Sequence, residues 1–178
     1  EWETGVKFEL TGEMRRTMPV VEKIEILYSG ILNEIELFSK IGEIINSDPQ
    51  KTEVKTCNDI HIYFIKASES NYGLDLLMST GPLSFIDQLS ANKLIDLKKA
   101  HSLEEEIFKT VSLPFILPEL RDNDELIQNC INSGNLPELI TFKDIKGILH
   151  NHSTWSDGIN TLEEMADHVR ITGFQYFG

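Results

Sequence analysis

Cysteines are scarce in this chain, and no apolar run reaches the length that a membrane span needs. The 178 residues include two cysteines, Cys57 and Cys130, which lie far apart and lack the spacing of a metal-binding motif. This usage indicates reduced thiols and predicts a cytoplasmic protein without a membrane partner. Residues 1–4 have neither the basic nor the apolar region of a signal peptide.

Cations are also scarce. The chain has 16 Lys and Arg residues against 29 Asp and Glu residues, which is a formal net charge of −13 at pH 7. Duplex DNA is held mainly through Lys and Arg contacts to phosphate, so this balance opposes nonspecific DNA binding. One small basic group, Lys98, Lys99 and His101, is interpreted as a solvated helix end. The sequence shows no internal repeat, low-complexity tract or Gly-rich phosphate loop.

The composition is that of a globular protein, with 40% apolar residues. Short apolar segments predict strands at residues 6–10, 23–28, 51–55, 60–65 and 74–78. Apolar residues at helical spacing predict helices at residues 32–45, 83–97, 103–110 and 124–132, the last with Asp122 or Asn123 near its N-cap. The helix at 32–45 would pack across the strands, which predicts an α+β fold.

The most informative stretch runs from His150 to Gly158. Residues i and i+2 of a strand point to the same face, so His150 and His152 can present two imidazoles to one zinc or manganese ion. Asp157 follows in a turn, where its carboxylate would act as a hard ligand or as a bridge between metals. A bare His-x-His pair also fits two exposed strand residues. A capping box at Thr161 and Glu164 then predicts a helix that ends near Gly173.

The longer string, His-x-His-Ser-Thr-x-Ser-Asp-Gly, resembles the first motif of the polymerase-and-histidinol-phosphatase (PHP) family. The resemblance implies phosphoester hydrolysis by a cluster of metals in a distorted (β/α)7 barrel, with His150, His152 and Asp157 as ligands. Ile148 stands where the family's strand often has Asp, which alters the support of the ligands. Three ligands are only the opening of such a site, so we expect a fragment of a longer enzyme.

The residues before the PHP-like motif resemble the palm of a family X DNA polymerase. That family has a Gly-Ser-x-Arg-Arg string, an Asp-x-Asp strand and a strand with one further Asp, and the corresponding stretches here are Gly12–Arg16, Lys23–Leu27 and Gly73–Leu76. The stretch from Leu113 to Arg121 resembles the Leu-Pro-x-Ile-Pro-Pro-Glu-Leu-Arg string that precedes the PHP domain in bacterial members. The order of palm, thumb and PHP domain is that of the bacterial family X polymerases.

Several positions depart from the family's pattern. Lys23 stands at the first catalytic carboxylate position, and Glu25 and Asp75 stand at the other two. Gly12 and Arg16 are expected to bind nucleotide, but Glu13 replaces a triphosphate-binding Ser. The thumb-like residues 85–101 lack the family's Tyr-Phe-Thr-Gly-Ser-Lys string. These departures predict a degenerate palm that binds dNTP and catalytic metal poorly.

We therefore expect a palm-like nucleotidyltransferase domain at residues 1–82, a small helical thumb-like region with a linker at 83–140, and a truncated PHP domain at 141–178. In the intact protein the expected activity is metal-dependent phosphoester hydrolysis, as in a 3′–5′ exonuclease that acts in DNA repair or end processing. The PHP site would hold Mn or Zn, and an active palm would hold Mg or Mn. The expected partner is DNA, bound through domains beyond this chain. Two alternatives stay open, namely a non-catalytic DNA-repair scaffold and a palm that still polymerises DNA.

Overall fold

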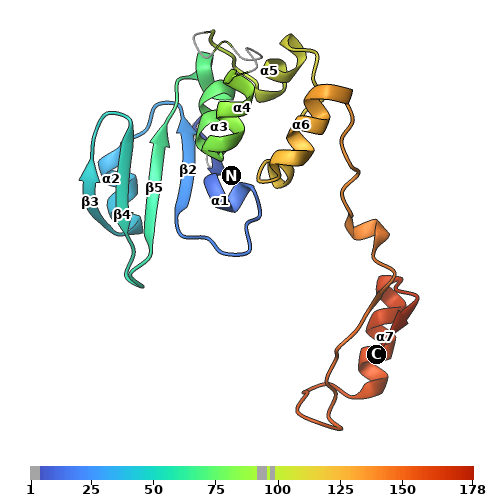
Figure 1. Cartoon of the computed structure of the whole chain (residues 1–178). Helices are drawn as coiled ribbons and strands as arrows, with labels where there is room; N and C mark the ends of the chain where they lie inside the picture. Colours follow the sequence, from blue (N-terminus) through green and yellow to red (C-terminus); the bar gives the residue numbers. More distant parts are fainter. Residues whose placement is uncertain (1–4, 92–95, 97–98) are drawn as a thin grey trace. The chain divides into compact units, whose positions relative to one another are not determined.

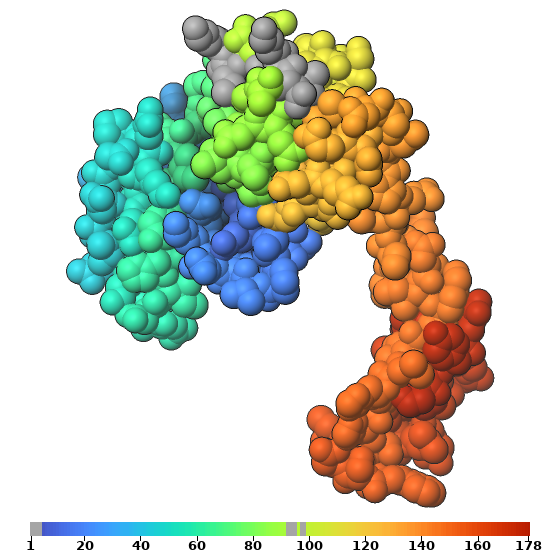
Figure 2. Space-filling view, in the orientation of Figure 1, coloured from blue at the N-terminus to red at the C-terminus, as the bar shows by residue number. Residues whose placement is uncertain are grey.

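The computed structural model describes residues 5–91, 96 and 99–178, and it divides into two compact units (Figure 1, Figure 2). The first unit is Glu1–Leu136, and the second, coloured from orange to red in both figures, is Pro137–Gly178. Residues 92–95 and 97 of the expected helix 83–97, and Lys98 of the basic group, lie outside the described residues. Within the described ranges, no helix has the length and apolar character to span a bilayer.

A five-stranded sheet organises the first unit, with the strand order β1-β2-β5-β4-β3. The strands are β1 (Lys7–Thr11), β2 (Ile24–Ser29), β3 (Glu43–Ser47), β4 (Lys51–Lys55) and β5 (His61–Lys66). The central pair β2 and β5 is parallel, and the other neighbours are antiparallel. This mixed sheet with several helices is compatible with the expected α+β fold.

Apolar residues cover both faces of the sheet. On one face Tyr28, Val54 and Phe64 pack with Phe38 of helix α2 (Glu34–Ile41). On the other face Leu27 and Ile65 pack with Tyr72 and Leu76 of helix α3 (Tyr72–Thr80). Because side chains alternate along a strand, Glu25 lies on the same face as Leu27, which is the α3 face.

Two expected elements of the first unit are wrong. The helix expected at 32–45 ends at Ile41, and residues 43–47 form β3 instead. A Cβ atom at Gly42 would lie 2.1 Å from the carbonyl oxygen of Lys55, so Gly42 allows the chain to turn closely against β4. Residues 74–78, expected as a strand, lie within α3, because a short apolar run does not by itself distinguish a buried helix from a strand.

Short helices complete the first unit. They are α1 (Gly12–Arg15), η1 (Glu69–Asn71), α4 (Leu83–Ala91), α5 (Glu104–Thr110), η2 (Pro118–Leu120) and α6 (Asp124–Ser133). The expected N-cap of α6 is confirmed, since the Asn123 side chain accepts a hydrogen bond from the Leu126 amide at 2.9 Å. His101, expected to be solvated, is buried, and its carbonyl oxygen accepts a hydrogen bond from the Gly73 amide because it lies against the start of α3.

The second unit contains η3 (Phe142–Asp144), β6 (Gly147–Ile148), α7 (Leu162–Thr172) and β7 (Tyr176–Phe177). Strands β6 and β7 are parallel and are joined through α7. The capping box of Thr161 and Glu164 and the left-handed residue Gly173 after α7 are both confirmed. Strand β6 is shorter than expected, because the sequence predicted that it continues through His150 and His152. It ends at Ile148, and His150 has a φ of 62°, which a strand does not accommodate.

Candidate functional site

The palm-like site begins where Gly12, at the start of α1, approaches β2. Gly12 has a φ of +61°, and a Cβ atom there would lie 2.5 Å from Glu25 Oε2. The structure therefore brings together two residues that the sequence assigned to this site. In the sheet, Glu25 lies opposite Thr11 of β1 and Tyr63 of β5.

Glu25 is paired with a cation from the sheet itself. Lys51 of β4 places its Nζ atom 3.2 Å from Glu25 Oε1 and 4.5 Å from the centroid of the Tyr63 ring. The three residues share the α3 face, since Lys51 lies opposite Ile65 and Tyr63 lies opposite Glu25. Local sequence patterns do not indicate Lys51 and Tyr63 as members of this site, because only the strand order places β5 beside β2 and β4 beside β5.

A second carboxylate on this face is also engaged. Glu53 Oε1 lies 2.6 Å from His61 Nδ1 and accepts a hydrogen bond from the Tyr63 hydroxyl at 3.1 Å. The contact with His61 is the main reason that the pKa of Glu53 lies below its usual range. The polar face next to Glu25 is therefore a chain of mutually satisfied side chains.

Glu13 and Lys23 meet at the entrance to β2. The Glu13 carboxylate accepts hydrogen bonds from the backbone amides of Glu22, at 2.6 Å, and Lys23, at 3.2 Å. Glu13 thereby holds the turn before β2. The Lys23 side chain is exposed.

Asp75 does not lie on a strand, as the sequence analysis expected, but in the first turn of α3. Its Oδ1 atom accepts a hydrogen bond from Asn71 Nδ2 at 2.7 Å. Burial raises the pKa of the Asp75 carboxyl group, and the hydrogen bond from Asn71 opposes this shift in part. Asp75 also lines a shallow pocket with other residues of β5 and α3, including Ile65, Met78 and Ser79.

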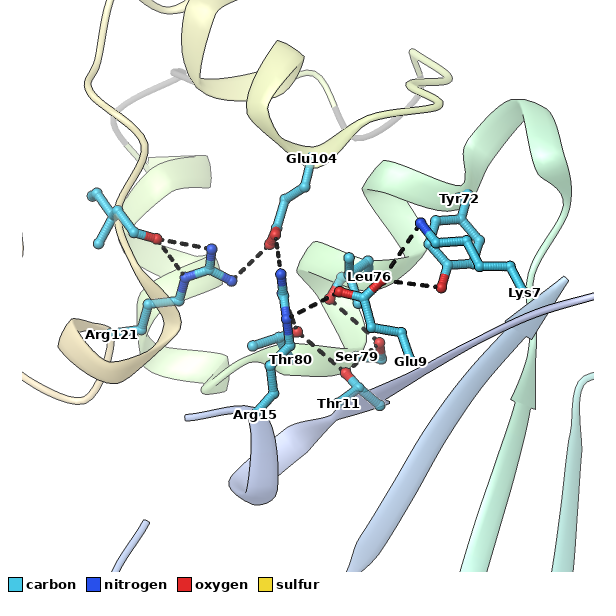
Figure 3. A network of polar contacts seen from close by, with 11 residues as sticks. Lys7, Glu9, Thr11, Arg15, Tyr72, Leu76, Ser79, Thr80, Glu104 and Arg121 are labelled. Carbon is cyan, nitrogen blue, oxygen red and sulfur yellow. Dashed lines mark hydrogen bonds and ion pairs between the residues drawn. The ribbon is translucent and has the colours of Figure 1, made fainter. Parts of the chain in front are cut away.

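Arg15 of α1 belongs to a network of polar contacts with the helical region (Figure 3). Its Nη2 atom donates to Glu104 Oε2 at 2.8 Å, and its Nη1 atom donates to Thr80 Oγ1 at 2.8 Å. Its Nε atom lies 3.6 Å from Glu9 Oε1. Arg15 therefore has carboxylate partners within the unit on both sides.

Glu104 also binds a second guanidinium, that of Arg121 (Figure 3). Arg121 Nη1 donates to Glu104 Oε1 at 2.7 Å, while its Nε and Nη2 atoms donate to the Ile116 carbonyl oxygen at 3.0 and 2.9 Å. The Arg121 side chain has 0% exposure and is surrounded by the rings of Phe85, Phe108 and Phe115. Arg121, which ends the Leu113–Arg121 string, is thus a core residue of the helical region.

Arg16 is bound in the same region. Its Nε atom donates to Asp122 Oδ2 at 2.8 Å, and its Nη1 atom donates to the Thr80 carbonyl oxygen. Its side chain is only 10% exposed. The guanidinium expected to bind nucleotide is therefore already held by Asp122 and Thr80, neither of which the sequence analysis identified as its partner.

The second unit brings together the three residues of the PHP-like motif. The His150 and His152 rings are stacked with their centroids 5.2 Å apart, and His152 Nδ1 is hydrogen-bonded to Asp157 Oδ1. That hydrogen bond is the main cause that lowers the pKa of the Asp157 carboxyl group. A bend at His150, and not strand alternation, places the two imidazoles side by side.

This donor set fits part of a zinc or manganese shell. Two adjacent neutral imidazoles are suitable ligands for either metal. Across the described part of the chain, however, no group of three or more His, Cys, Asp or Glu side chains is arranged to hold a metal ion. Asp157 lies at the ring of His152 and does not complete such a group. The structure therefore places His150 and His152 side by side with Asp157 at the ring of His152, and whether they ligate a metal stays a prediction.

Together, these features define a class, namely an α+β protein with a mixed sheet and a separate unit that carries adjacent imidazoles. No protein family model matches the chain. The chain is 40% identical over 78 residues to the DNA polymerase/3′-5′ exonuclease PolX of Bacillus subtilis (strain 168). The match covers 44% of this chain and 13% of that protein. It confirms the resemblance to the bacterial family X DNA polymerases that the motifs indicated.

Proposed function

We propose that this chain belongs to a metal-dependent phosphoesterase that acts on DNA ends and whose palm-like unit no longer polymerises DNA. The loss of polymerase activity is proposed because the charged groups of the palm-like unit are paired with one another. The phosphoesterase activity is proposed because the imidazoles of His150 and His152 are stacked and because the chain is similar to a protein named as a polymerase and exonuclease.

The palm-like site lacks what two-metal nucleotidyl transfer requires. That reaction uses carboxylates to hold two divalent ions against the triphosphate. Here Glu25 is paired with Lys51, Asp75 is held in α3, and Lys23 stands where an anion is needed. Two like unit charges 4 Å apart repel by about 4 kcal/mol at an effective dielectric constant of about 20, and a divalent ion doubles this cost.

The arginines at the end of α1 are also paired with carboxylates. Arg15 is held by Glu104 and Arg16 by Asp122, both through charge-assisted hydrogen bonds. A triphosphate would have to displace these carboxylates before either guanidinium could bind it. The unit is better suited to position DNA or the neighbouring catalytic domain than to bind dNTP.

In the second unit, His150 and His152 would hold one Zn or Mn ion through their free ring nitrogens. The metal would supply an activated water as the nucleophile for phosphoester cleavage. The residues of this chain contribute the orientation of the two imidazoles, which the bend at His150 and the turn after His152 produce.

The experiment is digestion and extension of an end-labelled primer-template by the full-length protein with Mn²⁺, with and without dNTPs. We expect shortening of the primer in both conditions and no extension. His150→Ala combined with His152→Ala should abolish shortening, whereas Glu25→Gln should leave it unchanged. Extension that Glu25→Gln removes would overturn the proposal for the palm, and shortening that survives the double variant would overturn it for the second unit.

The competing candidate is a palm that retains DNA polymerase activity. It is favoured by the similarity to the Bacillus subtilis relative, which is named as a DNA polymerase as well as an exonuclease. The same assay separates the two, because a polymerising palm would depend on Glu25 while the nuclease activity would not.

A further inference from the structure

Two carboxylates on the α3 face of the sheet belong to one row that crosses three neighbouring strands. Glu25 of β2 lies opposite Tyr63 of β5, and Tyr63 lies opposite Glu53 of β4. The three strands lie side by side in Figure 1. Residues that lie opposite one another on adjacent strands point to the same face, so the two carboxylates flank the phenol ring. Carboxylates gathered on one face are what divalent ions need in a nucleotidyltransferase palm.

Lys51 supplies a cation to this row. Its Nζ atom lies 3.2 Å from Glu25 Oε1 and 4.5 Å from the centroid of the Tyr63 ring. The hydrogen bond with His61 is the main cause that lowers the pKa of Glu53, and the charge of Lys51 lowers that pKa further. The ammonium group therefore acts on both carboxylates and faces the ring between them.

The turn before β4 fixes the backbone of Lys51. The Asp48 carboxylate accepts hydrogen bonds from the amides of Gln50, at 2.8 Å, and Lys51, at 2.9 Å. The Asp48 amide donates to the Lys51 carbonyl oxygen at 2.9 Å. Lys51 thus reaches Glu25 from a fixed position at the first residue of the strand.

We propose that the ammonium group of Lys51 takes the place that a divalent ion would need beside Glu25, so that this sheet face is neutralised from within and excludes metal. The residues present do not fit a palm metal, because a cation already contacts the carboxylate and would repel a second one. Mg and Mn ions take carboxylate oxygens as ligands, and an ammonium group donates hydrogen bonds to the same oxygens. The inference rests on the proposed loss of polymerase activity and names a residue that enforces it.

Line broadening by substoichiometric Mn²⁺ in the ¹H–¹⁵N NMR spectrum of the chain tests this role, because the paramagnetic ion broadens only the amide signals close to it. In the unsubstituted chain the Glu25 and Tyr63 amide signals should persist. Lys51→Gln removes the charge, and Lys51→Met also keeps the aliphatic stem, so both signals should be lost in either variant. Lys51→Gln combined with Glu25→Gln should keep them, because the carboxylate that would hold the ion is gone.

Two further variants are the controls. Lys51→Arg keeps the positive charge and should behave as the unsubstituted chain. Lys55→Gln is the matched control, since Lys55 lies on the same face of β4 but pairs with Asp59 at 2.5 Å. It should leave the Glu25 and Tyr63 signals in place. Loss of these signals in the unsubstituted chain would overturn the inference, because the ammonium group would not exclude the ion. Their persistence in both Lys51→Gln and Lys51→Met would overturn it as well, because the carboxylates would not form a cation site.

Primer extension separates this inference from the proposed function. Extension by the full-length protein, together with unbroadened Glu25 and Tyr63 signals in Mn²⁺, would contradict the proposed loss of polymerase activity and leave the exclusion of metal at Glu25 standing. Absence of extension, together with signals that Mn²⁺ broadens in the unsubstituted chain, would contradict the role of Lys51 alone.

Discussion

At the scale of single residues, Glu104 is a buried carboxylate that pairs with two guanidinium groups. Its side chain is 2% exposed and receives hydrogen bonds from both Arg15 and Arg121 (Figure 3). Burial lowers the pKa of the Arg121 guanidinium, and the negative charge of Glu104 opposes that shift. A buried ion pair contributes little net stability against an apolar pair, but the loss of one partner leaves a buried charge unpaired.

Glu104→Gln should therefore destabilise the chain strongly. Glutamine keeps the shape and one acceptor oxygen but removes the charge that both guanidiniums face. We expect a loss of about 3 kcal/mol in the free energy of unfolding, at the lower end of the cost of breaking a buried pair. Urea denaturation followed by circular dichroism measures it. Glu105→Gln, on the exposed side of α5, should change stability by less than about 0.5 kcal/mol. Equal stability of the two variants would contradict this account of Glu104.

Removal of the charge of Asp75, unlike that of Glu104, should stabilise the fold, and this effect should depend on pH. Its folded-state pKa is raised above its unfolded value by burial, so ionised Asp75 costs stability at neutral pH. The cost appears as the pH rises through the folded-state pKa and is absent below the unfolded-state pKa of about 3.9. Asp75→Asn keeps an acceptor for Asn71 and should raise the melting temperature at pH 7.

The advantage of Asp75→Asn should shrink as the pH falls below the folded-state pKa and vanish below about pH 4. Thermal unfolding across this range measures it, with Asp87→Asn, an exposed carboxylate on α4, as the control. A lower melting temperature for Asp75→Asn at pH 7 would mean that the ionised carboxylate stabilises the fold. Such a result would revive a charged role for Asp75.

At the scale of elements, Gly42 decides where α2 ends. The apolar spacing of residues 32–45 continues past Ile41, but β3 has to pair with β4, and the turn between α2 and β3 passes close to the backbone of Lys55. The pairing of the strands thus overrides the helical pattern. The apolar residues of α3 likewise fit a strand as well as a helix, so the local pattern alone does not decide between the two.

Gly42→Ala should accordingly destabilise the first unit. The added methyl group would lie 2.1 Å from the Lys55 carbonyl oxygen, and neither backbone segment can yield without disturbing the edge of the sheet. We expect a loss of about 1–3 kcal/mol, which is typical of overpacking. Urea denaturation tests it against Ser39→Ala on the exposed side of α2, which should cost less than about 0.5 kcal/mol. Unchanged stability of Gly42→Ala would show that the turn is free to move.

At the scale of the whole molecule, the balance of charge opposes nonspecific binding of this chain to DNA. With 16 cationic side chains against 29 anionic ones, and with Arg15 and Arg16 bound internally, this chain has few cations to offer to phosphate. Nonspecific DNA binding depends on such contacts and on the counterions they release.

The chain by itself should therefore bind duplex DNA with a Kd weaker than about 10⁻⁴ M at physiological salt, the weak end of the nonspecific range. Fluorescence anisotropy of a labelled duplex measures the affinity, and repetition at lower salt measures the number of phosphate contacts. The affinity should change little with salt concentration. A Kd below about 10⁻⁶ M with a steep salt dependence would reveal a cationic surface that this account lacks.

The sequence by itself determined the features that depend on neighbouring residues. Four strands, the capping box at Thr161, the stop at Gly173, and the resemblance to family X polymerases follow from local spacing and local strings. The tertiary structure alone decided which charged groups meet. Arg15 and Glu104 are 89 positions apart, and Arg16 and Asp122 are 106 positions apart, so only the packing of the helical region against the palm-like sheet pairs them. Lys51 reaches Glu25 for the same reason, because strand order, which local patterns do not specify, places β4 beside β5 and β5 beside β2.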